Sequence, residues 1–245
     1  MTMYSGDDYY PSGSDVDTIL ALCIRSLDNA DQATRHSLAH LVGHLLASTQ
    51  IERAVPIPEP TTKAKKEQDI AEAGLSAVAN TASEVTKPTF TPNEMFNHLS
   101  NHFNKTNISH KTKIGIFDFY AALFIRLGPS FVESNFSLIV AHLMTEIVSR
   151  SGSTRYETLL VRSLVGILLR DLIGLRMLSE QGQISAIQEL ANAYLKRWPA
   201  MMPGQVAPSS AVLVIVLREV AGLLQQLGNA PPPVQVRPFL KGIKV

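Results

Sequence analysis

Residues 113–148 carry the clearest alternation of apolar and polar positions in the chain. Apolar side chains recur every three or four residues on both sides of one interruption, at Gly128 and Pro129, which is the spacing of one face of an α-helix. Glycine just past a helix end suits a left-handed backbone, and proline cannot continue the helix that it follows. The pattern therefore predicts two antiparallel helices with facing apolar stripes. The stripe positions are Phe117, Tyr120, Ala121 and Phe124 before the break, and Phe136, Ile139, Val140, Leu143 and Ile147 after it.

A second helix pair is predicted near the start of the chain, within residues 14–49. Ser14 with Asp17 resembles a capping box, and Asp31 suits the N-cap of the following helix. The second helix of this pair is predicted to bury one apolar stripe. That stripe consists of Leu38, Leu41, Val42 and Leu45.

Four further helix starts are predicted beyond residue 90. Thr91 can cap a helix that has Pro92 in its first turn and Glu94 at its third position. The other starts lie near Thr154, at Ser179 and near Ser209. The wide apolar stripe after Thr154 predicts a helix that has neighbours on two sides.

Five segments follow from these patterns. We predict a disordered N-terminus at 1–13, a HEAT-like helix pair at 14–49, a flexible insert at 50–90, HEAT-like helical repeats at 91–227, and a linker or tail at 228–245. About eight helices joined mostly by short turns, with no convincing strand, predict an all-α fold. The order helix–turn–helix is typical of a HEAT-type α-solenoid built from antiparallel helix pairs.

The composition changes this picture little. The chain has 245 residues and a net charge of +1, so no overall field attracts nucleic acid or an acidic membrane surface. The single cysteine, Cys23, cannot form an intramolecular disulfide and fits a reducing compartment. The longest unbroken apolar run, 211–217, is far shorter than the ~20 residues that span a membrane, so we predict no transmembrane segment.

Three histidines offer the strongest candidate for site chemistry. His36, His40 and His44 are four residues apart, and two histidines at that spacing on a helix can bind one zinc ion. They face away from the predicted apolar stripe, and no carboxylate or cysteine lies at ligand spacing beside them. We interpret them as an exposed, mildly pH-sensitive face, with zinc binding as the alternative. His98 and His102 have the same spacing and are a weaker candidate for a site.

Other candidates for chemistry are weaker still. Cys23 lies on an apolar helix face, where a buried structural thiol is expected. The sequence has no nucleophile elbow, no phosphate-binding glycine loop and no paired-carboxylate motif, so we predict a protein that is not an enzyme, with no catalytic, cofactor-binding or metal-binding residues. The clustered aromatic residues are expected to pack in the core. A basic cluster could contact phosphates, but we interpret it as a solvated turn; it consists of Lys105, His110, Lys111 and Lys113.

The first helix pair carries a family resemblance. The segment LCIRSLDNADQATRHSLAHLVGHLLAS, residues 22–48, resembles the HEAT consensus, although Thr34 replaces the usual valine. It is more specifically similar to the HEAT-repeat-containing protein 5 family of animals and to its fungal counterparts, the large accessory proteins of the clathrin adaptor complex at the trans-Golgi network. In this chain Ser26 replaces the family's alanine, and His40 replaces its usual lysine.

Two further blocks resemble the family in the same order. The first, residues 113–149, matches an aromatic-rich helix followed by Leu127, Gly128, Phe131, Glu133, Asn135 and Phe136. The second, residues 160–194, matches an arginine-rich helix followed by a Glu-x-x-Gln-x-x-Ala helix, here Glu180, Gln183 and Ala186. Family members are much longer, so the chain resembles a segment of one of them.

The resemblance implies a non-enzymatic scaffold. Such a scaffold assists the localisation of the clathrin adaptor complex, with possible accessory proteins, and vesicle traffic between the trans-Golgi network and endosomes. It implies a cytoplasmic protein, peripheral on those membranes through its partners. The alternatives are an α-solenoid scaffold of another pathway, such as nuclear transport or signalling, and a histidine-rich metal-binding protein. Fold alone does not separate them.

Overall fold

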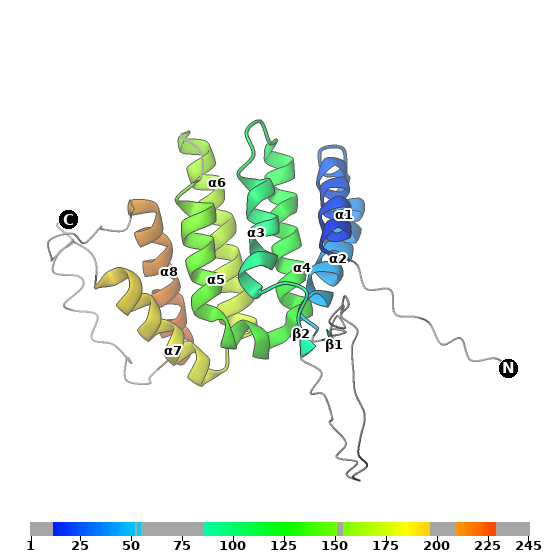
Figure 1. Ribbon diagram of the computed structural model, residues 1–245. Helices are drawn as coiled ribbons and strands as arrows, with labels where there is room; N and C mark the ends of the chain where they lie inside the picture. Colours follow the sequence, from blue (N-terminus) through cyan, green and yellow to red (C-terminus); the bar gives the residue numbers. More distant parts are fainter. Residues whose placement is uncertain (1–11, 52, 55–85, 151–153, 197–208, 229–245) are drawn as a thin grey trace, which may run out of the picture.

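The computed structural model describes residues 12–51, 53–54, 86–150, 154–196 and 209–228 (Figure 1). The described part is all-α and contains eight α-helices: α1 (Gly13–Ser26), α2 (Gln32–Ser48), α3 (Pro92–Phe103), α4 (His110–Ser134), α5 (Phe136–His142), α6 (Arg155–Gly166), α7 (Glu180–Leu190) and α8 (Ser210–Leu227). Three of them continue into π-helical segments, η1 (Leu143–Val148), η2 (Ile167–Gly174) and η3 (Ala191–Leu195). The predictions for 1–11, for 55–85 within the insert and for 229–245 fall outside the described residues.

The predicted helix starts are mostly confirmed. Asp31 accepts a hydrogen bond from the Thr34 amide at 2.7 Å, and Glu94 Oε2 accepts one from the Thr91 amide at 2.8 Å. Ser179, Ser209 and Thr154 are the N-caps of α7, α8 and α6. These caps depend on residues within one turn, which is why the sequence reveals them.

The first helix begins earlier than predicted. Its capping box consists of Ser12 and Asp15, and not of Ser14 and Asp17. Both pairs have the same spacing, so local sequence cannot choose between them. The helical Gly13 packs against Phe90, whose ring would lie 3.3 Å from a Cβ at that glycine. This long-range contact accompanies the earlier start.

The interruption at Gly128 is confirmed, with a correction to its conformation. Gly128 has φ 83° and ψ 170°, a positive-φ but extended backbone, and not the left-handed helical one expected. Pro129 then begins a short helical turn that ends at Ser134, before α5. The five predicted stripe positions after the break are all buried.

The ends of the predicted insert are joined. Two strands of two residues each, β1 (Arg53–Ala54) and β2 (Thr86–Lys87), pair antiparallel. Beside them, the Thr89 amide donates to the Thr49 carbonyl at 2.9 Å, and Gln50 Nε2 donates to the Phe90 carbonyl at 3.1 Å. This contact brings the start of α3 next to the end of α2.

Each helix has neighbours along the array (Figure 1). Along one side α2 packs against α4, α4 against α6, and α6 against α8. Along the other, α3 packs against α5, and α5 against α7. The buried apolar residues form one connected core, in which Phe119, Tyr120 and Leu123 of α4 are fully buried.

Two polar groups in this core have partners on other helices. The Tyr120 hydroxyl lies 2.8 Å from His142 Nε2, and burial lowers the pKa of His142 to about 4. Lys113, predicted to lie in a solvated turn, is buried, and its Nζ pairs with Glu157 Oε1 at 2.7 Å. That prediction was wrong because the partner of Lys113 lies 44 residues further along the chain.

Two described helices, α4 and α8, pass a length and hydropathy test for membrane spans. Core helices of soluble proteins pass the same test, so this is weak evidence. The predicted lack of a transmembrane segment stays a prediction.

Helices α2 and α4 touch at a glycine. A Cβ built on Gly43 would lie 2.9 Å from the carbonyl carbon of Ala122, which is backbone and cannot give way. Gly43→Ala is therefore expected to lower the free energy of unfolding by about 1–3 kcal/mol, measured by urea denaturation.

Gly166 provides the matched control for this substitution. It is also helical, but nothing lies within 4 Å of a Cβ built on it. Gly166→Ala should stabilise the protein by about 0.5–1 kcal/mol through helix propensity alone. Equal stabilisation by both substitutions would contradict the close approach of α2 and α4.

Candidate partner-binding groove

A groove of about 1090 Å³ lies between α2 and α4. Its floor consists of small side chains, among them Ala39, Ala121 and Ala122, because the two helices approach closely near Gly43. Ile125 stands at the edge of the groove and is 60% exposed. The groove thus offers an apolar floor and an uncovered apolar side chain on one face of the protein.

Charged side chains form the rim of the groove. Arg35 Nε lies 3.2 Å from Asp118 Oδ2 across the two helices, an ion-pair distance, although the N–H is not directed at that oxygen as a hydrogen bond requires. Partial burial raises the pKa of Asp118, and the charges of Arg35 and His36 oppose that rise. Arg126 adds a cation that forms no ion pair with another described residue.

The three histidines of α2 also line the groove. His36, His40 and His44 are all exposed, as predicted. His36 Nε2 and His40 Nε2 lie 3.0 Å apart, and their rings meet edge to face with centroids 4.5 Å apart. The predicted apolar stripe of α2 was partly wrong: Leu41 is 50% exposed. The residues that α2 buries are Ala39, Val42, Gly43, Leu45 and Leu46.

The second histidine pair has a different environment. His98 Nδ1 lies 2.7 Å from Asp17 Oδ1, and the ring packs on Phe90. His102 Nδ1 lies 3.0 Å from Lys105 Nζ, and burial together with Lys105 lowers the pKa of His102. The two pairs share their spacing but not their surroundings.

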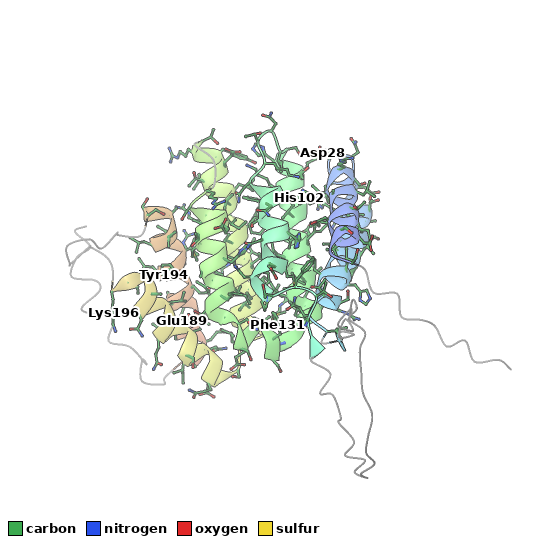
Figure 2. The ribbon with its side chains drawn as sticks, viewed as in Figure 1. Asp28, His102, Phe131, Glu189, Tyr194 and Lys196 are labelled. Atoms are coloured by element: carbon green, nitrogen blue, oxygen red, sulfur yellow. The ribbon has the colours of Figure 1, made fainter. Side chains whose placement is uncertain are left out.

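The remaining candidates from the sequence lie apart from the groove. Cys23 is buried, as predicted, and burial raises the pKa of its thiol. Most aromatic residues of α4 are buried in the core. Lys105, His110 and Lys111 are exposed at the α3–α4 connection, without Lys113. There, Asp28 (labelled in Figure 2) accepts hydrogen bonds from Ser109 and Thr112, which tie the α1–α2 turn to the start of α4.

A smaller cavity of about 80 Å³ lies between α6–η2 and α8. Three arginines line it, Arg162, Arg170 and Arg218, and so does Glu219, which is 2% exposed. Glu219 Oε1 has no hydrogen-bond partner among the described residues, and burial raises the pKa of this carboxyl to about 8 against the opposing charge of Arg170.

Sequence reasoning missed Asp118, Ile125 and Arg126 of the groove. No local signal marks them, because the groove exists only where α2 meets α4. Glu219 could have been found: it follows Ile215 and Val216 by four and three residues, on an apolar helix face.

Comparisons with known proteins leave the assignment open. No family model matches the chain, and no solved structure matches it. Within the described residues, no group of three or more histidine, cysteine, aspartate or glutamate side chains converges to hold a metal ion. The resemblance to the HEAT-repeat-containing protein 5 family stays a prediction.

Proposed function

We propose that the protein is a non-enzymatic scaffold, a HEAT-type α-solenoid that binds a partner in the groove between α2 and α4. The order in which the helices pack against one another supports the solenoid. Even-numbered helices contact one another in series, and odd-numbered helices do so from α3 to α7. Helices α1, α3 and α7 also pack on the even-numbered helix that follows each of them, and α5 does so through η1. In a solenoid each repeat contacts mainly its neighbours, which is this pattern.

The groove itself carries the proposal of partner binding. It combines an apolar floor, the exposed Ile125 and an excess of basic side chains on its rim. Asp118 is paired with Arg35, so Arg126 and the histidines set the character of the free rim. This chemistry fits a partner segment that places apolar side chains on the floor and acidic side chains on the rim.

The pathway rests on the sequence resemblance and not on the groove. In this proposal the partner belongs to the clathrin adaptor complex of the trans-Golgi network, and the protein is cytoplasmic and associates peripherally with trans-Golgi and endosomal membranes. The second candidate is a solenoid scaffold that uses the same groove in nuclear transport or signalling.

Affinity capture of the chain, tagged at its natural locus and analysed by mass spectrometry, tests both parts. We expect wild type to recover adaptor and clathrin subunits. Ile125→Glu with Arg126→Glu should reduce that recovery by more than about tenfold, because it replaces the apolar anchor and reverses the rim charge.

A matched control lies elsewhere on the surface. Leu175 and Arg176 form a second exposed pair of an apolar residue and an arginine, distant from the groove residues in sequence. Their double replacement by glutamate changes the net charge equally and should leave recovery intact. Adaptor recovery that survives the groove variant would refute the groove as the binding site. Other partners recovered by wild type and lost in the groove variant would support the second candidate.

A further inference from the structure

Two ring nitrogens on α2 already lie at nearly the separation that a metal chelate needs. His36 Nε2 and His40 Nε2 are 3.0 Å apart, and both rings are exposed. Two nitrogens bound to a tetrahedral zinc ion at 2.0–2.1 Å lie about 3.3 Å apart. The rings therefore need to separate by a few tenths of an ångström and to turn until both Nε2 lone pairs point at one ion.

We propose that His36 and His40 bind one zinc ion through their Nε2 atoms, at a two-histidine site that opens into the α2–α4 groove. The four-residue spacing places both rings on one face of a formed helix, so little chain entropy is lost on binding. Both Nε2 atoms must be unprotonated when zinc is bound. The ring that donates the Nε2–H hydrogen bond in the metal-free protein therefore gives up that proton to water and takes one from water on Nδ1, so it stays neutral. The remaining coordination positions are open to water.

The charges around the pair permit a cation. Asp118 lies on the facing helix and lines the same groove as His36. Arg35, the residue before His36, is an opposing charge, and its pairing with Asp118 reduces its repulsion. Imidazole is a favoured ligand of zinc, and a two-histidine site needs no change in the helix backbone.

The second histidine pair shows why spacing alone is not enough. His98 and His102 are also four residues apart, but His98 is held by Asp17 and Phe90, and His102 lies against the Lys105 ammonium. A zinc ion there would have to displace the contact of His98 with Asp17 and accept a cationic neighbour. The proposal therefore assigns zinc to His36 and His40 and not to His98 and His102.

Titration calorimetry of the tag-free full chain with zinc chloride tests the site. We expect saturable binding of one zinc ion per chain with micromolar affinity. His36→Ala and His40→Ala should each weaken it by more than about tenfold, because each removes a ligand. The double variant of His98→Ala with His102→Ala should bind zinc as wild type does.

Nuclear magnetic resonance provides a second readout that does not depend on heat. Zinc should shift the imidazole resonances of His36 and His40 and leave those of His98 unchanged. Absence of saturable zinc binding overturns the proposal. So does binding that survives His36→Ala, since that result would place the ion at His40 and His44, or binding that is lost only in the His98 and His102 double variant.

Discussion

Glu219→Gln is expected to raise the free energy of unfolding by several kcal/mol at about pH 8, on the order of 5, and to leave it almost unchanged at about pH 4. The Glu219 carboxyl is buried in α8, and its Oε1 faces the backbone of Gly174, where a Cβ would lie 2.9 Å from that oxygen. Burial raises its pKa from 4.5 to about 8. The folded protein therefore keeps this group protonated at neutral pH.

The direction of the effect follows from proton binding in the two states. Below pH 4.5 the carboxyl is protonated in both, and its full contribution to stability is present. Between about pH 4.5 and about pH 8 the unfolded chain releases the proton and the folded protein retains it, so stability falls by about 1.4 kcal/mol per pH unit. Above the folded pKa the loss is complete. Glutamine does not ionise, so the variant escapes this loss.

Urea unfolding at a series of pH values measures the difference between variant and wild type. The contribution of His142, which titrates in both proteins, cancels in that difference. Glu189→Gln, at a partly exposed carboxylate of α7, is the control and should follow the wild-type curve. Parallel pH curves for wild type and Glu219→Gln would show that Glu219 is ionised in the folded protein at neutral pH.

Phe136→Ala is expected to lower the free energy of unfolding by about 3–5 kcal/mol. Phe136 is 5% exposed at the start of α5 and belongs to the connected core, against which the partly buried Leu164 of α6 also packs. Truncation removes an aromatic ring from a region where α5 contacts α3, α4 and α7, and leaves a cavity that those helices cannot all close.

Denaturant unfolding at neutral pH measures this loss. Leu175→Ala is the control, because Leu175 is 47% exposed and its truncation should cost less than about 1 kcal/mol. A cost below about 1 kcal/mol for Phe136→Ala as well would mean that Phe136 faces solvent, and that the register of α5 differs from the structure.

Features set within one or two helical turns were the ones that the sequence predicted well. The N-caps at Asp31, Thr91 and Ser179 depend on a side chain and an amide three residues apart. The break at Gly128 depends on one glycine and the proline after it. The all-α class and the number of helices follow from the same local spacing.

The face that α2 buries shows where local spacing fails. The sequence favoured Leu41 for the core because it is large and apolar, yet Leu41 is half exposed. Small residues, Ala39 and Gly43, face α4 in its place, because the two backbones approach closely there. Side-chain size alone cannot reveal such a choice, since it depends on the shape of the facing helix.

By itself the sequence determined the helices, most of their starts and the exposure of His36, His40 and His44. Only the tertiary structure decided which helices meet, and therefore where the groove lies and that Lys113 is buried beside Glu157. It also decided that two histidine pairs with the same spacing have different surroundings. The physical reason is distance along the chain. A cap or a turn is stabilised by neighbours in sequence, whereas a groove or an ion pair between helices depends on residues that only packing brings together.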